Sequence, residues 1–182
     1  MIDSNESLEV VAVFFDVQNL YHASKSHGGS KISYKHLIDE IAKGRELFSA
    51  TAYTAQKDEK ASGSFYGALK KSGIEVHHKK VFTKRMPDGS RKVIPVHFDV
   101  EIACDAKSLP ERVTTVVLCT GNGNFAYLCD SLYNDSLDIE VWSFSESTSD
   151  SLKNNKKIKF VPIPKGCLLG EIEKEREEAK SA

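Results

Sequence analysis

Several features that mark particular protein classes are missing from this sequence of 182 residues. No apolar run approaches the roughly 18 residues that a membrane span needs, and residues 1–9 are too acidic and polar for a secretion signal. The four cysteines form no Cys-x-x-Cys pair, and no histidine lies at zinc-ligand spacing from them. We therefore expect a cytoplasmic protein without structural zinc, in which Cys104, Cys119 and Cys129 are reduced and buried.

The chain also lacks the net positive charge of proteins that attract nucleic acid over their whole surface, because its formal net charge is −1. Residues 79–92 are the exception. They hold six lysines and arginines and one aspartate, a net +5, which leaves −6 for the rest of the chain. Pro87-Asp88-Gly89 is a turn signal, so this segment is expected to be an exposed hairpin or long loop. It is either a solvated charged surface or a contact for the phosphate backbone of a nucleic acid.

Short apolar runs alternate with helical patterns along the chain, which predicts an α/β fold. We expect a parallel sheet of about five to six strands, with helices on both faces. The expected strands are 10–15, 47–54, 74–82, 113–119, 137–144 and 158–163, and the expected helices are 33–43, 65–71, 99–109, 125–133, 148–154 and 171–180. Pro162 predicts that the last strand lies at an edge. A flexible segment 1–9, one domain at 10–165 and a C-terminal helix or tail at 166–182 complete the expectation.

Polar side chains gather where the predicted strands end. Asp16 and Asn19 follow the first strand, Asp99 opens a helix, and Asn122 and Asn124 follow the strand at 113–119. Ligands of parallel sheets bind outside the carboxyl ends of the strands, so these groups are expected to converge. Carboxylates brought together repel one another unless a cation binds between them. Ligands that are all oxygen favour Mg²⁺ or Mn²⁺ over zinc.

Three motifs occur in a specific order. They are an apolar run ending in Asp-x-x-Asn (residues 11–20), then Asp99-Val100 followed by Asp105-Ala106, and then Thr-Gly-Asn-Gly-Asn-Phe (residues 120–125). Together they resemble the motifs of the NYN domain family, including its LabA-like group, within the PIN-like ribonucleases. The resemblance implies a Rossmann-like PIN/NYN domain that cleaves RNA with the help of Mg²⁺ or Mn²⁺.

The resemblance also implies roles for individual residues. The implied catalytic residues are Asp16, Asp99, Asn122 and Asn124. The implied metal ligands are Asp16, Asp99, Asp105 and Asn122. The implied contacts to RNA are Asn19, Lys84, Arg85, Arg91 and Lys92. Asp105 is six residues from Asp99, about 240° around a helix, so it cannot share the face of Asp99; its alternative roles are to orient a neighbour or to cap a loop.

Two departures from the family pattern bear on activity. Asn122 and Asn124 stand where the family usually has aspartates, and Val96 stands where it often has a basic residue. An asparagine offers a carbonyl oxygen without charge, so metal affinity and catalytic power should both fall. The expected function is a metal-dependent RNA nuclease that is attenuated or inactivated; the alternative is a non-catalytic RNA-binding or scaffolding protein on the same fold. RNA is the expected partner, a membrane and a dinucleotide are not, and a homodimer is left open.

Each motif also has a purely structural interpretation. Asp16 could end a strand and cap the next segment, and Asp99 could be a helix N-cap. Asn122-Gly123-Asn124 could be a tight turn and cap. The same glycines match a dinucleotide fingerprint, but they follow a late strand, and no ribose-binding acid lies about 20 residues further on.

Overall fold

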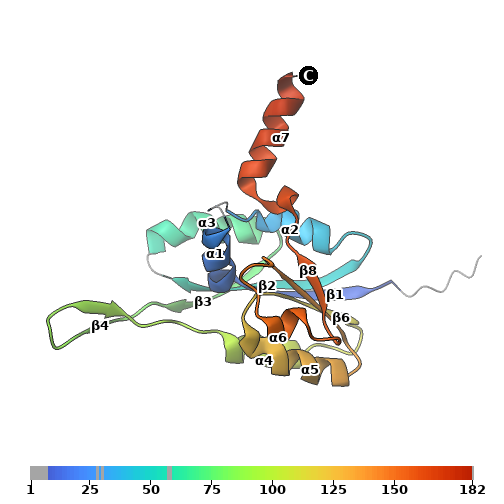
Figure 1. The fold of residues 1–182 in the computed structure, drawn as a ribbon, viewed down its shortest axis with the longest axis horizontal. Helices are drawn as coiled ribbons and strands as arrows, with labels where there is room; N and C mark the ends of the chain where they lie inside the picture. Colours follow the sequence, from blue (N-terminus) through green and yellow to red (C-terminus); the bar gives the residue numbers. More distant parts are fainter. Residues whose placement is uncertain (1–7, 28, 30, 57–58, 182) are drawn as a thin grey trace, which may run out of the picture.

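The computed structural model describes residues 8–27, 29, 31–56 and 59–181. Six parallel strands form its central sheet in the order β3-β2-β1-β6-β7-β8 (Figure 1). The strands are β1 (Val10–Asp16), β2 (Glu46–Gln56), β3 (Glu75–Lys80), β6 (Thr115–Cys119), β7 (Asp138–Ser143) and β8 (Lys159–Pro162). The chain builds outward from β1 to β3, then returns to pair β6 with β1. The strand order therefore reverses between β1 and β6, which is where parallel sheets bind ligands.

Helices cover both faces of the sheet (Figure 1). One face carries α1 (Val17–Ser26), α2 (Tyr34–Ile41) and α3 (Glu59–Lys71). The other carries α4 (Asp99–Lys107), α5 (Ala126–Asn134) and α6 (Asp150–Lys153). Two short 3₁₀ turns are η1 (Gly123–Phe125) and η2 (Lys165–Cys167), and α7 (Leu169–Ser181) projects away from the body. The parallel sheet with helices on both faces confirms the α/β fold class expected from the sequence.

Alternation along β1 explains why there are two hydrophobic cores. Val11, Val13 and Phe15 pack into the core beneath α1, α2 and α3. Ala12 and Phe14 point the other way, into the core shared with α4, α5 and α6. All five side chains are buried, which is why this strand reads as a continuous apolar run and not as an alternating one.

The expected basic hairpin is present as β4 (Thr83–Arg85) and β5 (Arg91–Val93), an antiparallel pair that extends well beyond the sheet (Figure 1). Its turn closes where the Met86 N–H donates to the Ser90 carbonyl at 2.8 Å. Gly89 takes a positive φ of 82° there, a conformation that costs glycine little. The turn signal therefore located the hairpin correctly.

Two expectations need correction. Helix α1 was missed, since its buried positions include only two large aliphatic side chains, Val17 and Leu20. Cys104 is exposed, whereas Cys119, Cys129 and Cys167 are buried and all four are unpaired. Cys104 lies on the outer part of α4, so an apolar surrounding sequence did not mean a buried position.

The flexible segment expected at 1–9 lies mostly outside the described residues. Among those that are described, no helix is long and apolar enough to cross a membrane.

Candidate active site

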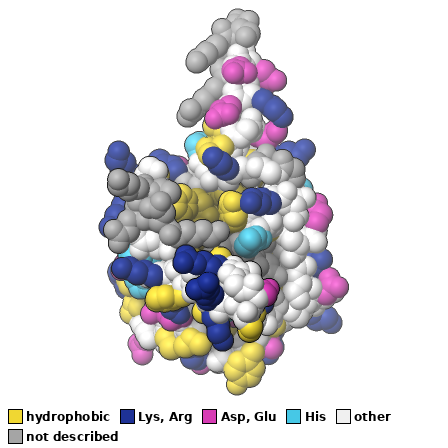
Figure 2. Space-filling model, turned by 90° about the vertical axis from the view of Figure 1, so that its left-hand side faces the viewer, with side chains coloured by type: hydrophobic (Ala, Val, Ile, Leu, Met, Phe, Trp, Pro, Cys, Tyr) yellow, Lys and Arg dark blue, Asp and Glu magenta, His cyan; other side chains and the backbone are white. Residues whose placement is uncertain are grey.

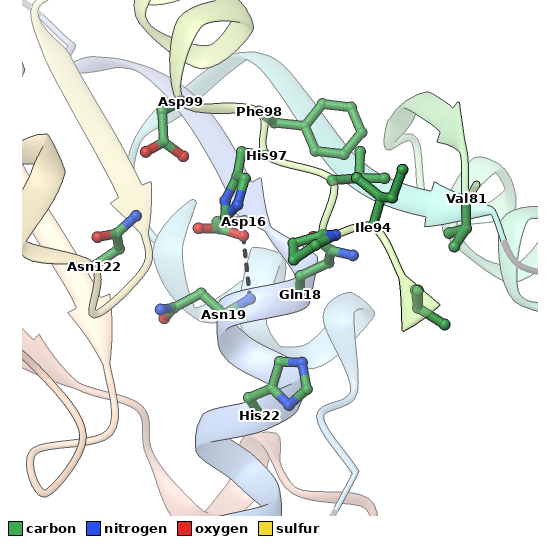
Figure 3. Close-up of a pocket in the computed structure, with 13 residues that line it drawn as sticks. Asp16, Gln18, Asn19, His22, Val81, Ile94, His97, Phe98, Asp99 and Asn122 are labelled. Carbon is green, nitrogen blue, oxygen red and sulfur yellow. Dashed lines mark hydrogen bonds between the residues drawn. The ribbon is translucent and has the colours of Figure 1, made fainter. Parts of the chain in front are cut away.

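Asp16 lies at the point where β1 leaves the sheet. Phe15 pairs with Cys119 of β6, so the residues after both strands emerge side by side. The Thr120 hydroxyl donates to Asp16 Oδ2 at 3.1 Å. The Asn19 N–H donates to Asp16 Oδ1 at 3.1 Å (Figure 3). Asp16 is therefore also the N-cap of α1. The capping role and the pocket position coexist, because capping uses only part of the capacity of a carboxylate to accept hydrogen bonds.

The surroundings of Asp16 disfavour the charged form of its carboxyl group. Burial raises the pKa of its carboxyl group, and the nearby Asp99 carboxylate raises it further. The hydrogen bonds from Asn19 and Thr120, and the nearby His97, act in the opposite direction but do not cancel the effect of burial. A cation beside Asp16 would stabilise the charged form that burial disfavours.

Asn19 ties the first motif to the third. Its Oδ1 accepts the Gly121 N–H at 2.7 Å. The Asn122 N–H donates to the Thr120 hydroxyl at 3.1 Å, which continues the chain of hydrogen bonds back to Asp16. Asn122 Oδ1 in turn accepts the Asn124 N–H at 3.1 Å, so Asn122 is the N-cap of η1. The turn-and-cap interpretation of this motif is correct for its backbone, and the turn fixes the Asn122 side chain beside the pocket.

The glycine in the middle of the third motif is required by close packing. A Cβ at Gly123 would lie 2.6 Å from the Ser149 hydroxyl oxygen and 2.9 Å from that of Ser151. The segment that leads into α6 therefore presses against the motif and holds its asparagines in place.

Asp99 and Asn124 contact each other across the pocket rim. Asn124 Nδ2 donates to Asp99 Oδ2 at 3.2 Å. Asp99 is the first residue of α4, and the N-cap is Phe98, which makes no capping bond through its side chain. Asp99 is thus not a helix N-cap. An amide at position 124 can donate to this carboxylate, whereas a carboxylate there could only repel it.

A cavity of about 480 Å³ brings these groups together. Four of the residues expected at the site line it: Asp16, Asn19, Asp99 and Asn122. Figure 3 shows these four side chains around one opening, with an apolar wall that includes Ile94 and Phe98 on the other side. Asn124 joins the group through its bond to Asp99.

Asp105 is not brought to this cavity. The Tyr53 hydroxyl donates to Asp105 Oδ2 at 2.5 Å, and His77 Nδ1 lies 3.7 Å from the same oxygen. Asp105 lies on a different face of α4 from Asp99, as the helical angle predicted. The structure thus places Asp105 in the alternative role of holding a neighbouring side chain.

Three further polar residues line the cavity: Gln18, His22 and His97. The first two lie one turn apart on α1, next to Asn19, so predicting this helix would have placed them on the same face. His97 precedes Asp99 by two residues in a segment without regular secondary structure. Its ring lies beside Asp16 in Figure 3 and favours the charged carboxylate. No sequence signal distinguished His97 from other exposed histidines.

The expected contacts to nucleic acid lie on the hairpin. Lys84 and Arg85 on β4 face Lys92 and Arg91 on β5, and all four are exposed. Viewed from the side to which the hairpin points, lysine and arginine side chains gather near the middle of the face (Figure 2). Val81, just before the hairpin, and Val93, the last residue of β5, line the cavity. The basic strands therefore extend outward from the edge of the pocket.

The donors present fit a hard divalent cation better than zinc. Asp16 and Asp99 supply carboxylates and Asn122 an amide oxygen, a set that suits Mg²⁺ or Mn²⁺ with much of its hydration retained. Within the ranges the structure describes, no three histidine, cysteine, aspartate or glutamate side chains are grouped to hold a metal. With two carboxylates, the pocket fits one weakly held ion.

A model of the NYN domain matches residues 10–164. The chain belongs to the NYN domain family. It is 27% identical over 149 residues to the "Low amplitude and bright protein LabA" of Synechococcus elongatus, covering 79% of this chain and 78% of LabA. This NYN domain also resembles the crystal structure of VPA0982, a protein of unknown function from Vibrio parahaemolyticus. The TM-score is 0.78 at 27% identity, over 90% of this chain and 98% of VPA0982. The family expected from the three motifs is thereby confirmed.

Proposed function

We propose that this NYN domain is a divalent-metal-dependent RNA nuclease of low activity. The observation that carries the proposal is the meeting of Asp16, Asp99 and Asn122 around one cavity at the carboxyl edge of the sheet. The basic hairpin that extends from the same edge supports RNA as the substrate. Membership of a family within the PIN-like nucleases adds to this support.

Asp16, Asp99 and the Asn122 side-chain oxygen would hold Mg²⁺ or Mn²⁺. When bound there, the ion would polarise a phosphodiester and lower the pKa of a bound water. Thr120 and Asn19 fix the Asp16 carboxylate, while Asn19 also holds the third motif in register with it. The hairpin side chains would bind the phosphates on either side of the scissile bond.

Low activity follows from the two asparagines. Each keeps the shape of the aspartate that the family usually has, but removes a negative charge that would help to hold the ion. The Asn124 amide also donates to Asp99, so it occupies one oxygen of a proposed ligand. Weaker metal binding should lower the rate at cellular metal concentrations, while the pocket geometry is retained.

The bond between Asn124 and Asp99 also favours a second candidate function. It stabilises the Asp99 carboxylate without metal, as a pocket that only binds RNA would require. A non-catalytic RNA-binding protein on the NYN fold would retain the basic hairpin and the pocket shape but would not depend on a divalent ion.

The deciding experiment is cleavage of an end-labelled single-stranded RNA with Mn²⁺, with Mg²⁺ and with EDTA. The nuclease should cut slowly with either ion, not with EDTA, and faster as Asn122→Asp/Asn124→Asp. Asp16→Asn and Asp99→Asn should each abolish cutting, which excludes a contaminating nuclease. RNA binding without cleavage by any of these proteins would assign the second function.

A further inference from the structure

An exposed apolar cluster lies at the root of the hairpin. Phe82 is 65% exposed, Val93 53% and Ile94 46%. The Ile94 N–H donates to the Phe82 carbonyl at 2.9 Å, so the two residues form the last rung of the hairpin, and the backbone that carries their side chains is fixed there. Single exposed apolar residues are ordinary, but a fixed group of three that includes an aromatic ring marks a binding surface.

Two of these residues, Phe82 and Ile94, line a second cavity of about 520 Å³. Its lining is mostly apolar, with two lysines at the rim: Phe82, Ile94, Pro95, Val96, His97, Lys79 and Lys80. Small-molecule sites typically enclose roughly 300–1,000 Å³, so there is room for a single planar ring system.

Residues 94–97 form a wall between this cavity and the pocket that holds Asp16, because the same four residues line both. Lys79 fixes the wall. Its Nζ donates to the His97 carbonyl at 2.9 Å, forms an ion pair with Glu101 at 2.5 Å and lies 4.8 Å from the centre of the Phe98 ring. A ligand could therefore enter both cavities with its connecting part passing over the wall.

The combination of an aromatic ring, an apolar hollow and surrounding cations favours one occupant. A nucleobase is flat and stacks on aromatic rings, and the phosphates attached to it are attracted to lysine and arginine. An apolar peptide would match the apolar surface but not the +5 charge of residues 79–92, and a second copy of this chain that met it with the same surface would bring an equal positive charge. Charge complementarity therefore selects a nucleotide.

We propose that the second cavity is a nucleobase subsite, in which a base of the RNA substrate stacks on Phe82. The proposal rests on the proposed function and adds the position of a neighbouring nucleotide. A base within a duplex is stacked on its neighbours and cannot reach Phe82 without unstacking. The subsite therefore selects single-stranded RNA, or an unpaired loop, over continuous duplex.

The first test uses fluorescence. The chain has one tryptophan, Trp142, which is only 6% exposed, so Phe82→Trp adds a single exposed indole. With EDTA present to prevent cleavage, a single-stranded oligouridylate should quench this indole, and an RNA duplex should not. The matched control is Tyr133→Trp, because Tyr133 is 46% exposed but lies at the far end of α5, away from the pocket edge.

The second test uses affinity under the same conditions. Phe82→Ala should weaken binding of the oligouridylate about tenfold, the loss expected for one base stacked on an aromatic ring. Tyr133→Ala should leave the affinity unchanged. Thermal unfolding of both variants confirms that each is folded.

The outcomes separate this inference from the function on which it rests. If the unmodified chain binds RNA and Phe82→Ala binds it equally well, the subsite is overturned and the proposed function is not. Equal quenching by duplex overturns the preference for single strands. Failure of the unmodified chain to bind any RNA overturns both. Loss of self-association in Phe82→Ala, with unchanged RNA affinity, would assign the surface to a second copy of the chain instead.

Discussion

The two ends of the parallel sheet hold their carboxylates, Glu140 buried and Asp16 half-buried, in opposite ways. At the amino end, Glu140 accepts hydrogen bonds from Arg45 at 3.1 and 3.3 Å, from Lys159 at 2.7 Å and from the Trp142 indole at 2.8 Å. Burial alone would raise the pKa of Glu140, but the bonds from Lys159, Trp142 and Arg45 outweigh it and hold the pKa below its ordinary value. At the carboxyl end, neutral groups donate to Asp16, and its pKa is raised.

This difference separates Glu140, a structural carboxylate, from Asp16, the carboxylate that we propose to be functional. Glu140 has its counter-charges supplied by the chain, so it needs nothing further. The Asp16 carboxylate lies close to that of Asp99, and its charge is only partly compensated. Perturbed carboxylates of this kind gather at functional sites, because a cation or substrate completes them. Removing charge should therefore destabilise the amino end and stabilise the carboxyl end.

The largest expected effect is at the amino end. Arg45→Met leaves Glu140 with fewer cations in a buried position and should cost about 3 kcal/mol of unfolding free energy. Urea denaturation at neutral pH measures the loss. Lys43→Met is the matched control, since the Lys43 side chain is 78% exposed and should change stability little.

The same variant has a pH signature with a definite sign. Because the pKa of Glu140 is lowered from 4.5, the stabilisation by its partners is present above that pH and is lost as pH falls through the lower folded value. The difference in unfolding free energy between the natural chain and Arg45→Met should therefore become smaller in acid. A gap that stayed constant down to the lowest pH at which the protein folds would contradict this account of Glu140.

The second effect sharpens the comparison by adding charge to the carboxyl end. Asn122→Asp/Asn124→Asp removes the donor that Asp99 now uses and brings two further carboxylates to the pocket. We expect a loss of about 1–3 kcal/mol in EDTA. Mg²⁺ or Mn²⁺ should restore it by binding the folded form, so the melting temperature should rise more with metal than it does for the natural chain. An equal rise in both proteins would mean that the pocket does not bind the ion.

The third effect removes charge from the same pocket. Asp16→Asn should stabilise the metal-free protein by about 1 kcal/mol at neutral pH, since the half-buried charge is lost while an amide can still accept a hydrogen bond. The pKa of Asp16 is raised from 3.8 in the folded state, so its contribution to stability is fully present below that pH and is lost as pH rises through the folded value. The gain in stability from Asp16→Asn should therefore develop as pH rises through the folded pKa of Asp16, and it should be absent at pH values below 3.8. Thermal melts from acid to neutral pH measure this, and a destabilised variant at neutral pH would contradict it.

The smallest effect on stability is expected at the hairpin. Replacing Lys84, Arg85, Arg91 and Lys92 by alanine removes exposed side chains, so stability should change by less than about 0.5 kcal/mol. RNA binding should nevertheless weaken, and the slope of log affinity against log salt should fall by about 0.7 for each phosphate that the variant no longer binds. Filter binding at several salt concentrations measures the slope. An unchanged slope would remove the hairpin from the RNA-binding surface.

The sequence located most of this architecture because parallel strands leave strong signals. The run from Val10 to Phe15 is apolar throughout, since β1 is buried on both faces. The residues that follow such strands are fixed at one edge of the sheet, so Asp16 and Asn122 could be placed together without knowing any contact. Pro162 likewise placed β8 at the edge, where the structure has it.

The remaining features depended on contacts that no short pattern encodes. The bond between Asn124 and Asp99 joins two segments far apart in the sequence. The second cavity depends on how the hairpin leaves the sheet, and its wall at residues 94–97 has no regular secondary structure. His97 belongs to that wall, and the path of the wall places it beside Asp16.

The most direct test of the carboxyl end as a metal site is calorimetric titration of Mn²⁺ into the natural chain, into Asp16→Asn and into Asn122→Asp/Asn124→Asp. The account predicts one weak site per chain, lost in Asp16→Asn and tightened in Asn122→Asp/Asn124→Asp. Binding of Mn²⁺ to Asp16→Asn with unchanged affinity, or no binding to any of the three proteins, would contradict it.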